Sequence, residues 1–176
     1  MNYFELFGLP IQLSVDKSLL AQRFQKLIAL EDNGHSRTGI PVSANSDPQH
    51  AAVISTAYKT LINQDETIRY VLYLKDLMHE DEKYEPDPEF MTAIYEMGET
   101  LAELTEGEED KLEALESEVK DLLKKTYADV EHIVENYEEG AVSEKELLQV
   151  KEYYYRKKYL QRVLDKVAQL RNIAAL

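Results

Sequence analysis

Apolar residues recur every three or four positions along most of the chain, a spacing that predicts an all-α protein. A short apolar turn at residues 3–7 ends at Gly8-Leu9-Pro10, where Gly and Pro favour a stop. Asp16 is a suitable N-cap for the helix that follows. Its apolar positions are Leu19, Leu20, Phe24, Leu27 and Ile28. We expect Asn33-Gly34 to end this helix in a turn, because both residues tolerate the left-handed backbone conformation.

A second helix is predicted after a long polar loop at residues 35–46, which show no periodicity. Asp47 and Pro48 combine an N-cap with a favoured first helical residue. The expected buried face is Ala51, Ile54, Ala57, Tyr58 and Leu61. After a break at residues 63–65, a further helix is expected to run to Leu77. The order predicts an antiparallel helical hairpin whose loop can offer polar side chains to a partner.

Residues 79–88 are charged and contain two prolines, so we expect a linker between domains at 1–78 and 89–176. Three helical stripes follow, which predict an antiparallel three-helix bundle. The first begins at the cap Asp87-Pro88, the second is expected from Glu109 to Tyr137, and the third follows a capping box at residues 143–146. Gly98 lies within the first stripe, where Gly lowers helix stability. It indicates either close packing against a neighbour or a compromise in which the lower stability is tolerated.

Charge is concentrated in the second half of the chain. The net charge is −14, of which residues 1–80 contribute −2 and residues 81–176 contribute −12. An anionic surface disfavours nucleic acid and anionic lipid, because binding to either depends on Lys and Arg. It suits a basic protein partner, or it serves solubility alone. The run of Tyr, Arg and Lys at residues 153–159 is therefore interpreted as bundle core plus a local basic strip.

The composition also bears on location. No apolar run approaches the roughly 18 to 20 residues that a membrane helix needs. The N-terminus has no basic region ahead of an apolar stretch, which argues against a secretory signal. The chain has no cysteine, as is common in a reducing compartment. We therefore expect a cytoplasmic protein.

Candidate chemistry is sparse. The sequence shows no nucleophile elbow, no phosphate-binding glycine loop and no zinc spacing, and the histidines at 35, 50, 79 and 132 form no ligand pattern. Glu96, Glu99 and Glu103 share one helix face. They could act as paired carboxylates only in a partly buried site, so a solvated or docking face is favoured. We expect no catalytic residue, no metal and no cofactor, and hence no enzyme.

The order of features resembles the J domain of HscB-type iron–sulfur co-chaperones. The resemblance rests on Tyr3-Phe4, Phe7–Pro10, Arg23-Phe24, Ile54, Ala57, Leu61 and Arg69-Tyr70. The acidic second half, from Pro88-Glu89-Phe90-Met91 to the segment 153–160, is similar to the C-terminal bundle of the same family. The resemblance covers nearly the whole chain. It implies a J-domain-like helical hairpin followed by a three-helix bundle.

The same resemblance implies a co-chaperone adaptor that carries an IscU-type iron–sulfur scaffold to an ATPase chaperone of the HscA or DnaK class. The family's scaffold-binding face corresponds here to Met91, Thr92, Tyr95, Glu96, Glu99, Glu103 and Tyr159. The spacing 91, 95, 99 and 103 keeps one stripe along a helix. Thr92 stands where the family usually has a larger apolar residue.

The chaperone-binding region departs from the family. The resemblance places it at Arg23, Lys26, Asp32, Asn33 and Gly34. The last three occupy the positions of the His-Pro-Asp tripeptide with which J domains stimulate the ATPase, and none of them is kept. Acidic residues at 31 and 32 also have the wrong sign for an acidic chaperone surface.

Two alternatives stay open beside the adaptor. One is a degenerate or engineered J-like protein that keeps the fold, with or without scaffold binding, and does not stimulate a chaperone ATPase. The other is an unrelated helical regulator or an enzyme with a carboxylate site, which only Glu96, Glu99 and Glu103 support.

Overall fold

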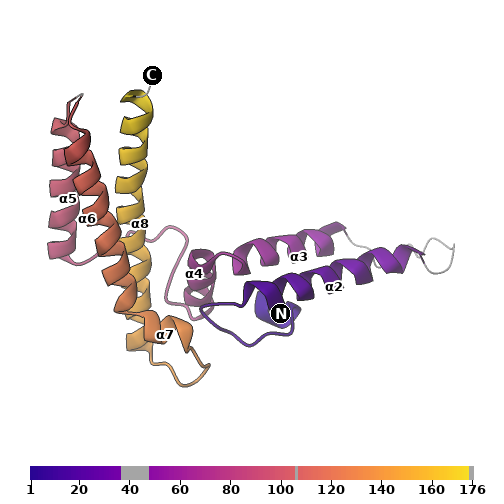
Figure 1. The fold of residues 1–176 in the computed structure, drawn as a ribbon. Coiled ribbons are helices and arrows are strands. Elements are labelled where there is room, and N and C mark those ends of the chain that lie inside the picture. The colour runs from indigo at the N-terminus through magenta and orange to yellow at the C-terminus, as the bar shows by residue number, and fades with distance from the viewer. Residues whose placement is uncertain (37–47, 106, 175–176) are drawn as a thin grey trace. The chain divides into compact units, whose positions relative to one another are not determined.

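The computed structural model describes residues 1–36, 48–105 and 107–174 (Figure 1). The expected N-cap Asp47 lies outside this range. The described chain forms two compact units, one of residues 1–77 with 137–142 and one of residues 78–136 with 143–176. The helices are α1 (Tyr3–Leu6), α2 (Lys17–Ser36), α3 (Pro48–Leu61), α4 (Gln64–Leu74), α5 (Pro88–Glu103), α6 (Glu109–Ala128), α7 (Glu131–Glu135) and α8 (Glu144–Ala174).

The first unit is built on the hairpin of α2 and α3, which lie side by side in Figure 1. Asp16 caps α2 as predicted, accepting a hydrogen bond from the Leu19 backbone N–H at 3.0 Å. α1 and α4 contribute to the same apolar core. Its fully buried members include Phe4, Leu20, Ile54, Ala57, Ile68, Val71 and Leu72. The predicted all-α class with an antiparallel hairpin is therefore confirmed.

Three details of the hairpin unit differ from the prediction. The backbone of α2 continues through Asn33-Gly34 to Ser36, so these residues do not end the helix. Asn and Gly lower helix stability but keep the backbone N–H that proline lacks, so a helix can pass through them. Ala51 is exposed rather than buried, and α4 ends at Leu74 instead of Leu77.

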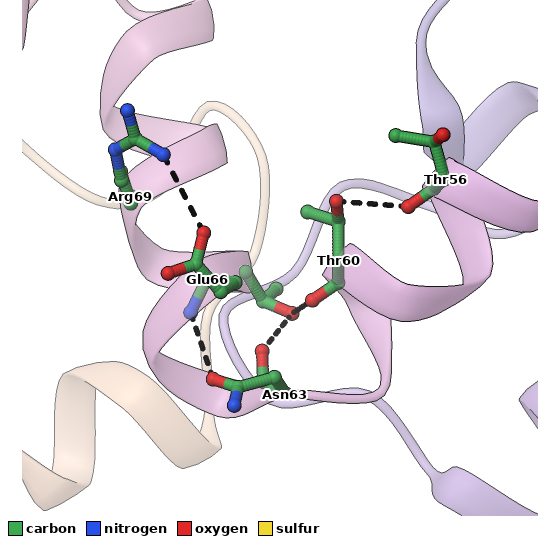
Figure 2. A network of polar contacts seen from close by, with 6 residues as sticks. Thr56, Thr60, Asn63, Glu66 and Arg69 are labelled. Carbon is green, nitrogen blue, oxygen red and sulfur yellow. Dashed lines mark hydrogen bonds and ion pairs between the residues drawn. The ribbon is translucent and has the colours of Figure 1, made fainter. Parts of the chain in front are cut away.

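The corner between α3 and α4 is held by short-range polar contacts (Figure 2). Asn63 caps α4 by accepting a hydrogen bond from the Glu66 backbone N–H at 3.0 Å, and Arg69 lies 3.5 Å from the Glu66 carboxylate. The hydroxyl of Thr67 is buried and donates to the Asn63 carbonyl at 2.8 Å. A buried hydroxyl is costly unless it has a partner, so this contact fixes the turn.

The second unit is a bundle in which α5, α6 and α8 lie side by side (Figure 1). Asp87 caps α5 by accepting from the Glu89 backbone N–H at 3.1 Å, and Ser143 and Glu146 form the predicted capping box of α8. The buried core is contributed by all three helices. It comprises Met97, Leu101, Leu112, Leu115, Val119, Leu160, Val163 and Val167.

The second helix of the bundle is shorter than predicted. α6 ends at Ala128, and α7 begins only at Glu131. At the break the backbone N–H of Val130 donates to the Tyr127 carbonyl, three residues back. Neither Gly nor Pro stands there, so the sequence carried no signal for the interruption. Gly98 has open space where a side chain would lie, which excludes close packing as its reason.

Residues 79–87, called the strap below, contain no helix and belong to the second unit. Pro86 is buried, and the ring of Tyr84 stacks on that of Tyr155 in α8 with centroids 4.6 Å apart. The strap is therefore fixed along α8 within this unit. The functional division of the chain into two domains joined at 79–88 stays a prediction.

Candidate functional site

The outer side of α5 presents an aromatic residue among acidic ones. The inner side packs into the core through Met97 and Leu101. On the outer side Tyr95 is 66% exposed, and the side chains of Glu96, Glu99 and Glu103 are also exposed. Carboxylates in this setting are solvated, which does not provide the burial that general acid catalysis needs. The same arrangement is suitable for contact with a basic protein surface.

Met91 and Thr92 lie one turn before this exposed region, at the start of α5. Met91 is half-buried and Thr92 is exposed. The Thr92 hydroxyl donates to the Pro88 carbonyl at 3.0 Å, so its polar atom is already engaged within the helix. The α5 stripe, defined as Met91, Thr92, Tyr95, Glu96, Glu99 and Glu103, is continuous along the helix.

Tyr159 comes from α8 and is half-buried. The guanidinium of Arg162 lies over its ring, 5.3 Å from the centroid. One turn earlier, Arg156 lies over the ring of Phe90 in α5, 5.1 Å from the centroid. Because residues three apart share a helix face, Tyr159 is on the flank of α8 that faces α5. The structure thus places Tyr159 on the side of α8 that faces α5.

Glu152 of α8 contacts the start of α5, and no pattern in the sequence indicated this role. One carboxylate oxygen of Glu152 accepts from the Asp87 backbone N–H and from Arg156 Nε, each at 2.9 Å. Its other oxygen accepts from the Tyr84 hydroxyl. Burial alone would raise the pKa of Glu152, but these donors outweigh it and leave the pKa below its ordinary value. Burial also raises the pKa of Tyr84.

A partly buried ion pair lies beside this junction. Lys151, which is 6% exposed, places its ammonium 2.5 Å from Glu82 in the strap and 5.1 Å from the Tyr84 ring centroid. No local pattern in the sequence indicates this pair, because its members are 69 residues apart. Together with Glu152 it fixes the segment that leads into α5.

In the first unit, Arg23 has a structural contact. Its guanidinium donates to the Phe7 carbonyl at 3.2 Å and lies where a side chain at Gly8 would point. Lys26 is exposed on α2. The backbone of Asp32, Asn33 and Gly34 is helical. These five predicted chaperone-binding residues are therefore distributed along one helix and do not form a loop.

The far end of the hairpin is joined by a polar contact between helices. Nδ1 of His50 in α3 lies 2.7 Å from the carboxylate of Glu31 in α2. Both side chains are partly solvent-exposed, so the contact adds little stability but it occupies the acidic group next to residues 32–34.

Neither metal sites nor membrane helices are found among the described residues. No three of their His, Asp and Glu side chains are grouped as metal ligands would be. None of the described helices combines the length and apolar character required to cross a membrane.

The described residues combine a helical hairpin unit with an acidic bundle that presents an exposed aromatic and acidic stripe, an arrangement suited to contact with other proteins. A sequence family described as "HSCB C-terminal oligomerisation domain" matches residues 86–168. The chain belongs to the HscB family of co-chaperones, as the following relatives show.

The Vibrio vulnificus co-chaperone HscB homologue is 33% identical over 74% of this chain and 78% of its own length. The Vibrio cholerae homologue is 36% identical, and the match spans 60% of this chain and 62% of that protein. The structure of chaperone HscB from Vibrio cholerae superposes with a TM-score of 0.70 at 26% identity, covering 99% of each chain. These relatives are co-chaperones, and the family resemblance noted in the sequence is confirmed.

Proposed function

We propose that this chain is a co-chaperone adaptor in iron–sulfur cluster assembly, carrying an IscU-type scaffold protein to an ATPase chaperone of the HscA or DnaK class. Membership of the HscB family supports the co-chaperone role. The adaptor acts by binding rather than by catalysis and requires no cofactor. Its location is the cytoplasm, and neither nucleic acid nor a membrane is among its partners.

The observation that carries the proposal is the exposure of Tyr95 beside three carboxylates on α5. Tyr95 is 66% exposed although it lies on a helix that buries its opposite side. Aromatic side chains are common anchors in protein interfaces, because they bury a large area on binding. The surrounding Glu96, Glu99 and Glu103 would attract a basic scaffold surface. The stripe therefore fits a partner that combines an apolar pocket with Lys and Arg.

The α5 stripe is tested by measuring binding of an IscU-type scaffold protein to two variants by titration calorimetry. Tyr95→Ala removes the anchor, and Glu99→Lys reverses a charge on the same stripe. We expect each to weaken binding by about tenfold or more. The matched control is Glu113→Lys, which makes the same charge change at an exposed residue of α6. Unchanged affinity in both α5 variants would place the scaffold elsewhere.

A second candidate function is supported by the first unit. The chain lacks His-Pro-Asp, and the backbone at 32–34 continues as helix. We propose on this basis that the protein can carry a scaffold without activating a chaperone ATPase. Scaffold binding would then be its whole activity. The two functions differ only in ATPase stimulation, which a direct assay separates.

A further inference from the structure

α5 and α8 run in the same direction (Figure 1), and one contact at each end of the pair is consistent with a single register along the bundle. At one end, Phe90 packs against Arg156. At the other end, Leu104 and Leu170 line the same cavity of about 290 Å³. Both pairs are 66 residues apart in the sequence (90 to 156 and 104 to 170). Since all α-helices rise equally per residue, residues with this offset lie at the same height on the two helices.

This register places cations of α8 level with carboxylates of α5. Lys158, Arg162 and Lys166 are exposed and spaced four residues apart, so they form one row along α8. With the 66-residue offset, Arg162 is level with Glu96, and Lys166 is level with the turn that carries Glu99. The bundle thus carries two parallel sets of charges, called the acidic column (Glu96, Glu99 and Glu103 of α5) and the basic column (Lys158, Arg162 and Lys166 of α8).

The basic row is not neutralised by the acids of its own unit. Within the described part of the chain, no carboxylate forms an ion pair with Lys158, Arg162 or Lys166. The neighbouring Asp165 accepts a hydrogen bond from Gln161 instead. Residues 81–176 contain 25 acidic and 13 basic residues, so a row of three cations is opposite in sign to this half of the chain as a whole.

Aromatic rings support two of these cations. The ammonium of Lys158 lies 5.0 Å from the Tyr154 ring centroid, and the guanidinium of Arg162 lies 5.3 Å from that of Tyr159. Cation–π contacts orient a charge without cancelling it. Because Tyr159 belongs to the proposed scaffold-binding face, its contact with Arg162 makes the basic row continuous with that face.

We infer that the scaffold contacts both columns. On this inference its contact surface carries a basic strip, which meets the carboxylates of α5, and beside it an acidic strip, which meets the cations of α8. This inference rests on the proposed function and extends it to Arg162 and its neighbours on α8. An acidic surface alone would accept a basic partner in many orientations. Two parallel columns of opposite sign accept the partner in a single orientation, because any other orientation places like charges together.

The experiment compares charge reversals of equal size in the full chain, with an IscU-type scaffold as the ligand. Arg162→Glu tests the row. Lys124→Glu is the matched control, at an exposed residue of α6. The scaffold must be basic where it meets α5, so added negative charge should on average strengthen binding. We expect Arg162→Glu to weaken it about tenfold instead, and Lys124→Glu to leave it equal or tighter. Arg162→Lys keeps the charge and should keep most of the affinity.

The outcomes separate this inference from the proposed function. Weaker binding by Arg162→Glu alone, with retention in Arg162→Lys, supports the inference. If Arg162→Glu behaves like Lys124→Glu, the inference is wrong. In that case the result for Glu99→Lys decides the proposed function. If Glu99→Lys weakens binding, the proposed function stands; if Glu99→Lys has no effect, the proposed function fails together with the inference. Far-ultraviolet circular dichroism confirms that each variant is folded, as expected for exposed side chains.

Discussion

The carboxylate of Glu152 in α8 accepts a hydrogen bond from the backbone N–H of Asp87, the residue that caps α5, at 2.9 Å. One side chain thereby joins the last helix of the bundle to the first turn of the helix that presents the α5 stripe. Hydrogen bonds to a charged group contribute more than neutral ones, about 1.5 to 3 kcal/mol each. Glu152 is therefore a positioning residue for the proposed site.

Replacing Glu152 by Gln should destabilise the second unit. The amide keeps the shape but removes the charge, and it cannot accept from Tyr84, Asp87 and Arg156 as the carboxylate does. We expect the free energy of unfolding to fall by about 1 to 3 kcal/mol in urea titrations. Glu118→Gln, at an exposed residue of α6, is the control and should change it by less than about 0.5 kcal/mol. Equal stability of the two variants would show that the Glu152 contacts contribute nothing net.

The lowered pKa of Glu152 gives this contact a defined pH dependence. An unfolded Glu has a pKa of about 4.3, so the stabilisation is complete above that pH and is lost as the pH falls through the lower pKa of the folded state. The difference in unfolding free energy between the unmodified protein and Glu152→Gln should therefore shrink below about pH 4.5. Urea titrations at a series of pH values measure it. A difference that stays constant down to pH about 3 would argue against the lowered pKa.

Two glycines should respond to alanine in opposite directions. Gly8 has φ +64°, a conformation that side chains disfavour, and a Cβ there would lie 2.9 Å from the Arg23 guanidinium that holds the Phe7 carbonyl. Gly8→Ala should cost about 1 to 2 kcal/mol. Gly98 lies within α5 with open space around it, so Gly98→Ala should gain about 0.5 to 1 kcal/mol. Thermal unfolding of the two variants measures both changes, and a shift in the same direction for both would contradict this assignment.

We expect the unmodified protein to leave ATP hydrolysis by a DnaK-type chaperone near its basal rate. The missing tripeptide would be restored by Asp32→His, Asn33→Pro and Gly34→Asp together. Pro cannot donate the helical hydrogen bond, so α2 should also end near residue 32. Single-turnover ATP hydrolysis should rise with the triple variant and not with Asn33→Pro alone, which shortens the helix without restoring the tripeptide. Stimulation by the unmodified protein would reject the second candidate function.

Local signals in the sequence were sufficient for most of the fold. Asp16, Asp87 and Ser143 cap the helices that they were predicted to cap, because capping involves residues only two or three positions away. The break after Ala128 and the passage of α2 through Asn33-Gly34 were missed. Neither place carries a decisive local signal, since Asn33 and Gly34 keep the backbone N–H that a helix needs and no Gly or Pro stands at residues 127–131.

The candidate site was only partly accessible from the sequence. The spacing of the α5 stripe defines a helix face, and family resemblance points to Tyr159 as its neighbour. The contacts of Glu152 and Lys151 with the strap could not be predicted, because they join residues more than 60 positions apart. The constant register of α5 and α8 was equally hidden, since no local pattern relates two helices separated by a third.

The shared register of α5 and α8 limits how the lengths of these helices can change. Adding or deleting one residue between Phe90 and Met97 would rotate everything beyond it by about 100° around the helix. The distal carboxylates would then turn away from Arg162 and Lys166, and the core side chains Met97 and Leu101 would leave the interior. Variation in this bundle should therefore occur by substitution within the two helices, with changes in length confined to the connections on either side of α6.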